Sequence, residues 1–280
     1  MNNQVWFVTG ASKGLGLSLA QTLLRKGYRV AATSRRREEL VAAIGETATN
    51  FLPLTLNILD EAHVAEAIAA TVAHFGTVDV VVNNAGYGLV GAIEELTDAE
   101  ARANFDINVF GTLNVIRQAL PQMRSQGKGH IFNIASIGGF TGAFPAFGIY
   151  CATKFAVHGF SESLAQEVKP FGIGVTVVSP GYFRTDFLGA SLGLPAREIP
   201  EYANVRAVQS LHQHDYNGRQ AGDPDKAAAA MIQVLEDGTA PLHLFLGEDA
   251  YQLAEQKIAA VQADLDAVRP LATATGFEHA

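Results

Sequence analysis

Short apolar runs recur along the chain, and each is followed by a longer segment in which apolar residues return every three or four positions. The runs are continuous rather than alternating, as in parallel strands whose two faces are both buried. The longer segments have the spacing of amphipathic helices. Strands are therefore expected at residues 5–8, 28–33, 51–56, 78–82, 130–135, 175–178 and 242–246.

Helices are expected between these strands, which predicts an α/β fold with a doubly wound parallel sheet and right-handed crossovers. No repeat, low-complexity tract or linker interrupts the alternation, so we expect a single domain over residues 1–280. The first helix is expected to begin at residue 14, and the others are expected at 38–44, 61–75, 98–123, 150–171 and 224–236.

Two segments fall outside the alternation. Residues 182–222 have no regular pattern and contain several glycines and prolines, and a loop this long in a compact domain is often an active-site lid. Residues 248–269 have helical spacing and predict a C-terminal helix, after which the chain from Pro270 is expected to fray. This helix has two open roles, which are to cover the sheet or to contact a second subunit.

Composition narrows the classes of function. The 280 residues are 48% hydrophobic, which is ample for a buried core, and their net charge is −8. That charge argues against a general affinity for nucleic acid or anionic membranes. No apolar run reaches the ~18 residues of a membrane helix, and the first residues do not have the pattern of a signal peptide. The single cysteine, Cys151, excludes an intrachain disulfide, so a cytoplasmic protein is expected.

A glycine-rich turn, with Gly10, Gly14 and Gly16, joins the first strand to the first helix. This arrangement aims N–H groups of the helix N-terminus at a phosphate, and glycines let a pyrophosphate approach the backbone. The spacing differs from Gly-x-Gly-x-x-Gly, and Lys13 is not placed as in a P-loop. Alone, the turn fits a plain strand–helix connection equally well.

Three arginines, at 35–37, follow the second strand, where NAD sites usually carry an acid for the ribose 2′-OH. No acid lies between the glycine turn and these arginines. A guanidinium suits a 2′-phosphate, so we expect Arg35 to bind that group with Lys13 as a second cation. The other two arginines are more simply explained as a solvated helix start paired with Glu38 and Glu39.

Polar and small residues, Asn83, Asn84, Ala85 and Gly86, follow the strand at 78–82. Amide side chains at the carboxyl end of a strand can hold backbone or ligand at the crevice of a parallel sheet. An ordinary Asx turn would also place them there.

Tyr150 and Lys154 stand four residues apart at the start of a predicted helix and therefore share one face. A phenol with a pKa near ~10 is a poor acid–base group at neutral pH, and a nearby ammonium would lower that pKa. Ser136 follows the strand at 130–135 and can hydrogen-bond an oxygen that gains charge. Asn108 is polar within an apolar helical segment. A Tyr-x-x-x-Lys pair alone is common on helix surfaces.

In combination and in this order, the motifs resemble the classical short-chain dehydrogenase/reductase family from about residue 5 to 187. The resemblance implies a single-domain Rossmann fold with a seven-stranded parallel sheet. The residues that carry it are Thr9, Gly10, Gly14, Gly16, Asn83, Asn84, Ala85, Gly86, Asn108, Ser136, Tyr150, Lys154, Pro180, Gly181 and Thr185.

The resemblance also implies roles. Tyr150 would be the acid–base residue, with Lys154 lowering its pKa and binding the nicotinamide ribose. Ser136 would polarise the carbonyl, Asn108 would hold a water that links the lysine to solvent, and Thr185 would bind the nicotinamide carboxamide. The implied cofactor-binding residues are Gly10, Ser12, Lys13, Gly14, Leu15, Gly16, Arg35, Asn57, Ile58, Asn84, Ala85, Gly86, Tyr150, Lys154, Pro180, Gly181, Phe183 and Thr185.

The sequence departs from the family pattern at two places. Asn57 stands where the family usually has an aspartate that contacts adenine, and an amide can still hydrogen-bond that base. The interval between Ser136 and Tyr150 is one residue longer than usual, which places an insertion within 138–148, beside the expected substrate site. The insertion weakens analogies about substrate more than those about catalysis.

We therefore expect an NADPH-dependent oxidoreductase that interconverts a carbonyl and an alcohol, on a hydrophobic ketone, aldehyde or secondary alcohol. Two alternatives stay open, which are a non-catalytic NADPH-binding sensor or scaffold and an enzyme that works mainly in the alcohol-oxidising direction. The resemblance implies a homodimer or homotetramer formed through the helices at 98–123 and 150–171.

Other residues beside the expected site have simpler explanations. An apolar substrate pocket is expected from the aromatic residues, and Cys151 is expected to serve packing. His212 and His214 lack the spacing of metal ligands, so no metal site is expected. The aromatic residues are Phe140, Phe144, Phe147, Tyr182 and Phe183.

Overall fold

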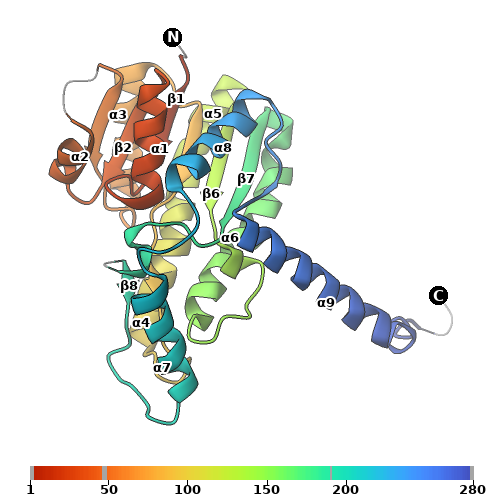
Figure 1. Ribbon diagram of the computed structural model, residues 1–280. Coiled ribbons are helices and arrows are strands. Elements are labelled where there is room, and N and C mark those ends of the chain that lie inside the picture. The colour runs from red at the N-terminus through yellow and green to blue at the C-terminus, as the bar shows by residue number, and fades with distance from the viewer. Residues whose placement is uncertain (1–2, 46–48, 190, 278–280) are drawn as a thin grey trace.

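The computed structural model describes residues 3–45, 49–189 and 191–277. Outside this range lie the start of the N-terminal segment, one position of the predicted lid and the end of the predicted frayed tail. A seven-stranded parallel sheet with strand order β3-β2-β1-β4-β6-β7-β9 forms the centre (Figure 1). The strands are β1 (Val5–Val8), β2 (Arg29–Ser34), β3 (Phe51–Thr55), β4 (Val80–Asn83), β6 (Gly129–Ile134), β7 (Ile173–Pro180) and β9 (His243–Leu246).

The order of the strands reverses between β1 and β4, so the sheet is doubly wound, as predicted. Helices cover both faces. One face carries α1 (Gly14–Arg25), α2 (Arg37–Ile44) and α8 (Pro224–Glu236). The other carries α3 (Glu61–Phe75), α5 (Thr112–Gln126) and α6 (Gly148–Val168).

The central strands are continuous apolar runs because each face meets helices. On β1, Trp6 and Val8 pack into the core beneath α1 and α8, whereas Phe7 packs into the core beneath α3 and α5. All three side chains are fully buried. A strand in this position has no exposed face on which polar residues would alternate with apolar ones.

Two predicted helices, at 61–75 and 224–236, are confirmed residue for residue. The first has a clear start and end, since Asp60 accepts hydrogen bonds from the N–H groups of Ala62 and His63 and the helix closes at Gly76, whose φ is 87°. The helix expected at 98–123 is divided. It comprises α4 (Asp98–Phe105), a π-helical segment (Asp106–Gly111) and α5.

The expectation that 182–222 lacks regular structure is wrong. A short strand, β8 (Leu192–Gly193), pairs with β5 (Gly88–Leu89). Helix α7 (Ala203–Ser210) follows and continues as a π-helical segment (Leu211–Tyr216). The sequence pattern missed α7 because the helix has only eight residues, so its apolar face has room for just Val205 and Val208.

The C-terminal helix α9 (Glu248–Ala272) passes through Pro270, so the chain does not fray at that residue. It begins beside β9 and points away from the rest of the molecule (Figure 1). Among the described residues, no helix combines the length and the apolar character needed to cross a membrane.

A buried histidine makes the stability of the fold depend on pH. His130 on β6 lies 3.0 Å from Thr176 Oγ1 through its Nε2, and burial lowers its pKa to about 4. In an unfolded chain a histidine titrates near ~6.5, so between these values the unfolded state binds a proton that the folded state does not. The free energy of unfolding must therefore fall as the pH decreases through this window.

We expect His130→Gln to remove this contribution. Relative to the variant, the wild type should lose roughly 2–3 kcal/mol between pH 7 and pH 4.5 in urea unfolding, from the size of the pKa shift. His74→Gln replaces an exposed histidine by the same residue and serves as the control. A constant difference between wild type and His130→Gln across this range would contradict the prediction.

Candidate active site

A cavity of about 830 Å³ opens at the carboxyl ends of β1, β4, β6 and β7. It therefore lies where the strand order reverses, which is the usual ligand site of an open α/β sheet. Of the eighteen predicted cofactor-binding residues, all but Gly16 line this cavity. Ser136 also lines it, whereas Asn108 lies behind its wall.

The glycine turn forms one end of the cavity. Gly10 and Gly14 have φ angles of 63° and 58°, which favour glycine. A Cβ on Gly10 would lie 2.8 Å from the Cα of Ala85. Helix α1 begins directly after Lys13, whose side chain makes no capping hydrogen bond, so the first N–H groups of the helix face the cavity without a side-chain cap. A pyrophosphate fits such an end.

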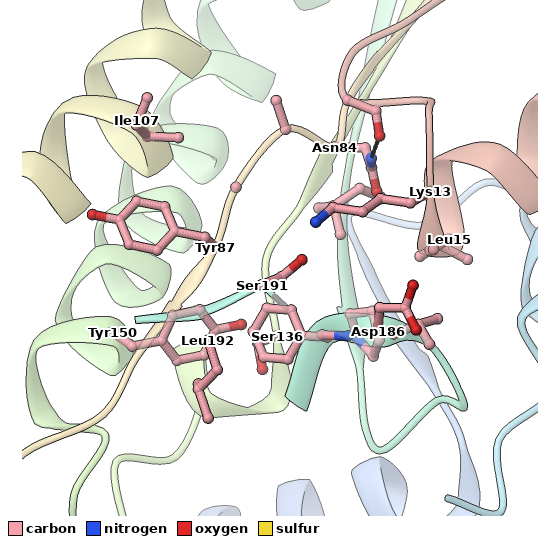
Figure 2. A pocket seen from close by; sticks show the side chains of 18 of the residues that line it. Lys13, Leu15, Asn84, Tyr87, Ile107, Ser136, Tyr150, Asp186, Ser191 and Leu192 are labelled. Atoms are coloured by element: carbon pink, nitrogen blue, oxygen red, sulfur yellow. Dashed lines mark hydrogen bonds between the residues drawn. The ribbon is translucent and has the colours of Figure 1, made fainter. Parts of the chain in front are cut away.

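Asn84 holds this turn to the end of β4. Its Nδ2 donates to the carbonyl oxygens of Thr9 and Gly10, both at 3.0 Å (Figure 2). The hydroxyl of Thr9 in turn accepts from the N–H groups of Asn84 and Ala85, also at 3.0 Å. Gly16 packs behind the turn, where a Cβ would strike the amide nitrogen of Asn84. Asn84 and Gly16 therefore shape the site from within the protein.

Lys13 and Arg35 are exposed and stand at the rim of the same end. The expected ion pair between Arg36 and Glu39 is confirmed. Glu39 also lines the cavity, and hydrogen bonds from Arg36 and Ser12 lower the pKa of its carboxyl group. This acid escaped the sequence reasoning because it lies within α2, past the position where an acid was sought.

Ser136, Tyr150 and Lys154 converge on the opposite wall, and Figure 2 shows the first two side by side. The Ser136 hydroxyl accepts from the Gly138 N–H at 3.1 Å and lies close enough to the Tyr150 phenol to lower its pKa. Lys154 Nζ donates to the Ile134 carbonyl at 2.8 Å and lies 5.9 Å from the centre of the Tyr150 ring. Strand β6 and helix α6 thus bring together three residues that are up to eighteen positions apart.

Burial governs the protonation of this wall. It raises the pKa of the Tyr150 phenol above its ordinary value, and Ser136 acts in the opposite direction. It also lowers the pKa of Lys154 to about 8. The expected lowering of the phenol pKa by the ammonium is wrong for this structure, because desolvation of the buried phenol is the largest effect and Lys154 is not among the groups that shift this pKa. At pH 7 the phenol keeps its proton.

Asn108 lies within the π-helical segment between α4 and α5. Its Nδ2 donates to the Tyr87 carbonyl at 3.1 Å and to Thr153 Oγ1 at 3.0 Å, while its Oδ1 accepts from the Tyr87 N–H at 3.0 Å. A Cβ on Gly86 would lie 3.0 Å from that Oδ1. Asn108 therefore fixes the backbone after β4 against α6, and its implied role in holding a water stays a prediction.

Aromatic and aliphatic side chains close the space in front of Tyr150. The Phe187 ring lies 5.6 Å from the Tyr150 ring. Phe140 is the exception among the predicted aromatics, since it packs on Phe245 at 5.1 Å outside the cavity. Cys151 is buried and burial raises the pKa of its thiol to about 11, which suits packing. The apolar lining residues are Phe144, Phe147, Phe187, Leu188 and Leu192.

The structure does not bring His212 and His214 together as ligands. His212 lines the cavity, with Nε2 2.8 Å from the Tyr182 hydroxyl and Nδ1 2.8 Å from the Val208 carbonyl. His214 is exposed and its Nδ1 lies 3.1 Å from the Ser210 carbonyl. Both nitrogens of the first imidazole are thus already engaged.

A separate cluster, formed by His158, Glu162 and His243, has donor atoms within 4.8 Å of one another. His158 is buried and its Nε2 lies 2.9 Å from Ser179 Oγ, whereas the other two residues are exposed. His243 Nε2 lies 3.9 Å from Glu162 Oε1. The cluster therefore adds a charged contact between α6 and β9 when His243 is protonated.

A buried acid, Glu95, fastens part of the segment 182–222. Its carboxylate accepts from the N–H groups of Ala92 and Ile199, both at 2.8 Å, and pairs with Arg206. Burial opposes ionisation, but these hydrogen bonds hold the pKa of Glu95 below its ordinary value. The sequence offered no signal for this role, because an acid in Glu-Glu-Leu reads as surface.

A second acid that the sequence did not reveal is Asp249, in the first turn of α9. Its Oδ2 accepts from the Tyr182 N–H at 2.7 Å. Gly181 lies so close to this carboxylate that a Cβ there would collide with it. The loop after β7 is therefore positioned by the start of the C-terminal helix.

Comparison with known proteins identifies close relatives. The protein-family model for short chain dehydrogenases matches residues 4–192. The chain is 37% identical over 274 residues to oxidoreductase BOA17 of Botryotinia fuckeliana, covering 97% of this chain and 99% of that protein. It is 34% identical over 250 residues to a 3-ketodihydrosphingosine reductase of Bacteroides thetaiotaomicron, covering 88% and 89%. A short-chain dehydrogenase from Streptomyces avermitilis superposes with a TM-score of 0.88 at 40% identity, covering 98% and 100%.

The packing of Gly16 gives a testable consequence. A methyl group there meets the Asn84 amide and the Gly10 carbonyl, so Gly16→Ala must displace the glycine turn. Overpacking of this kind costs about 1–3 kcal/mol of stability. Gly159→Ala is the matched control, because Gly159 lies in α6 with open space around it and alanine favours a helix by about 1 kcal/mol. Urea unfolding should show opposite signs for the two variants, and equal stability of Gly16→Ala and wild type would refute the packing argument.

Proposed function

The chain belongs to the short-chain dehydrogenase family, and from this premise we propose that it is an NADP(H)-dependent enzyme that interconverts a hydrophobic carbonyl compound and the corresponding alcohol. Oxidoreductase chemistry at a CH–OH group follows from the family. The preference for NADP(H) and the substrate class are the proposed part. The observation that carries the proposal is the convergence of Ser136, Tyr150 and Lys154 on one wall of the cavity.

The cavity suits a nicotinamide dinucleotide. The uncapped start of α1 and the open glycine turn fit a pyrophosphate, and the loop after β7 supplies backbone at the other end. When bound, the nicotinamide supplies or accepts a hydride. The protein binds the cofactor and the substrate, orients them and transfers one proton.

Tyr150 is the proposed proton donor in reduction. Because burial raises the pKa of its phenol, the proton is present at pH 7 and is released only as charge develops on the carbonyl oxygen. Ser136, which lies close to the phenol, can donate to the same oxygen. In the reverse direction the deprotonated phenolate of Tyr150 would accept the alcohol proton, while the Ser136 hydroxyl donates a hydrogen bond to the same oxygen.

Lys154 is proposed to supply a positive charge beside the phenol of Tyr150. With a pKa of about 8 it is mainly an ammonium at pH 7, and its bond to the Ile134 carbonyl fixes the chain. A cation near the phenol favours any negative charge that develops there. Asn108 is a positioning residue in this scheme, since it orders the backbone of Tyr87 rather than touching the cavity.

NADP(H) is favoured by the charges at the far end. Arg35 and Lys13 are exposed cations at the rim, and a 2′-phosphate would meet both. Among the described residues the acids that line the cavity are Glu39, which is already paired with Arg36, and Asp186, which follows Thr185. A hydrophobic substrate is favoured by the phenylalanine and leucine side chains in front of Tyr150. The relative that reduces 3-ketodihydrosphingosine, as its name states, is consistent with such a substrate.

A non-catalytic NADPH-binding sensor is the second candidate, and it keeps the same cofactor. The placement of Ser136 beside a buried Tyr150 argues against it, because a sensor needs no proton donor at this wall. A preference for alcohol oxidation would use the same residues. Turnover on a panel of ketones and aldehydes, compared with the matching alcohols, separates these functions.

Removal of the phenol oxygen tests the chemistry. Tyr150→Phe should lower turnover by at least about 10²-fold, the typical contribution of a positioned acid–base group, while the dissociation constant for NADPH stays within a few-fold. Tyr87→Phe removes a phenol oxygen from the same cavity and should leave turnover nearly unchanged. Activity of Tyr150→Phe near that of the wild type would mean that another group supplies the proton.

Cofactor choice is tested by direct binding. NADPH should bind more tightly than NADH, and Arg35→Ala should remove most of the difference, at a cost of about 1.5–3 kcal/mol for one charge-assisted hydrogen bond. Arg102→Ala removes an exposed arginine that pairs with Asp98 far from the rim and should change neither constant. Equal affinities of the wild type for the two nucleotides would exclude the preference for NADP(H) and leave the proposed carbonyl chemistry intact.

A further inference from the structure

Helix α9 leaves the body of the protein after its first two turns and extends into solvent (Figure 1). At its root, Ala250 and Ala254 are buried beside Ile137, and Leu253 and Phe245 pack against the same cluster. Beyond this root nothing covers the helix, since every residue from 258 to 277 is exposed. The root alone therefore anchors a helix of 25 residues.

The exposed part carries an apolar stripe, formed by Ile258, Val261, Leu265 and Val268. Their exposed fractions are 58%, 40%, 56% and 51%. They follow one another at intervals of three, four and three residues, which is the 3.5-residue repeat of a seam between two helices that coil around each other. The stripe continues the face on which Ala254 meets the body. An exposed apolar face of this length indicates a surface that packs against another molecule.

We propose that a second copy of this chain covers the stripe, with the two α9 helices packed antiparallel. Each helix joins its body at its N-terminal end, so a parallel pair would bring two bodies to the same place. An antiparallel pair puts the bodies at opposite ends and relates the copies by a two-fold axis. The surface is then self-complementary, as such an interface must be.

The apolar residues fit this arrangement. When Ile258 faces Val261 of the second copy, the heptad spacing places Tyr251 opposite Val268 of the second copy. Leu265 then lies at the end of the seam, next to the root of the opposite helix, where Ala254 is already buried against its own body. Tyr251 is 56% exposed in the single copy, so it too gains cover from the pairing.

The charges flanking the seam are complementary in the same register. Lys257 lies beside Asp264 of the second copy, and Glu248 lies beside Arg269 of the second copy, each pair occurring twice by symmetry. No two acids meet across this seam. The charge pattern thus selects the register that the apolar residues also select.

The composition of α9 argues against an anionic lipid surface as the occupant. The helix has five acidic and two basic residues, whereas a helix that lies on anionic lipid usually has a basic polar face. The net charge of −8 on the whole chain adds to that repulsion. A second copy of the chain has no such conflict.

Charged substitutions on two faces of α9 test the proposal in the full-length protein. Ile258→Glu with Leu265→Glu alters the stripe, and Gln256→Glu with Ala263→Glu places the same number of carboxylates on the opposite, exposed face. In sedimentation velocity over a range of concentrations, the stripe variant should halve the mass of the largest assembly, with an increase in the dissociation constant of at least about tenfold. The control should match the wild type. A dimer held by α9 would become a monomer, and a tetramer that also pairs through α5 and α6 would become a dimer, so the mass halves in either case.

A charge exchange tests the register. Lys257→Asp and Asp264→Lys should each weaken the assembly by about three- to tenfold, and the double variant should return it to the wild-type value. A stripe variant with the same mass as the wild type at every concentration would overturn the proposal. The proposal would also be overturned if the mass of the wild type did not change with concentration and the wild type bound phosphatidylcholine vesicles through the stripe. The occupant would then be lipid. Failure of the double variant to recover would overturn the antiparallel register. None of these outcomes depends on turnover, so they are independent of the proposed enzymatic function.

Discussion

The carboxamide of Asn84 holds together the two turns between which the cavity opens. It ties the carbonyl groups of Thr9 and Gly10 to the end of β4, and the Thr9 hydroxyl returns two hydrogen bonds to the backbone there. The strands β1 and β4 are adjacent and parallel, and the loops that follow them diverge. These contacts give hydrogen-bond partners to the buried polar groups at that point. Gly16 has to lack a side chain because this amide fills the space behind the turn. The phosphate end of the cavity therefore depends on packing within the protein as much as on affinity for an anion.

The sheet was predictable because burial on both faces makes each central strand a continuous apolar run. Trp6 and Phe7 point into different cores, and neither position tolerates a polar residue. The helix α3 was predictable to the residue because Asp60 caps it and Gly76 ends it. The helix α7 was not, since its eight residues carry only Val205 and Val208 on the buried face. Sequence periodicity reveals a buried face only where the element is long enough for the pattern to repeat.

The site also has features that were predictable from the sequence and features that were not. Ser136, Tyr150 and Lys154 could be proposed from spacing and resemblance, and they do line one cavity. The direction of the phenol pKa could not be proposed correctly, because burial is a property of the assembled fold. Glu95 and Asp249 were equally out of reach. Glu95 binds the N–H group of Ile199 and Asp249 binds that of Tyr182, both far away in the chain, and such partners leave no mark on local sequence.

The anchoring of Glu95 has a consequence for which part of the segment 182–222 can move. A carboxylate that is buried with two N–H groups and a guanidinium cannot be separated from them without a large cost. The loop at Ala92 and the chain at Ile199 and Arg206 are thus held together as one unit. Any motion of the segment over the cavity must leave this unit in place, although none of its residues lines the cavity.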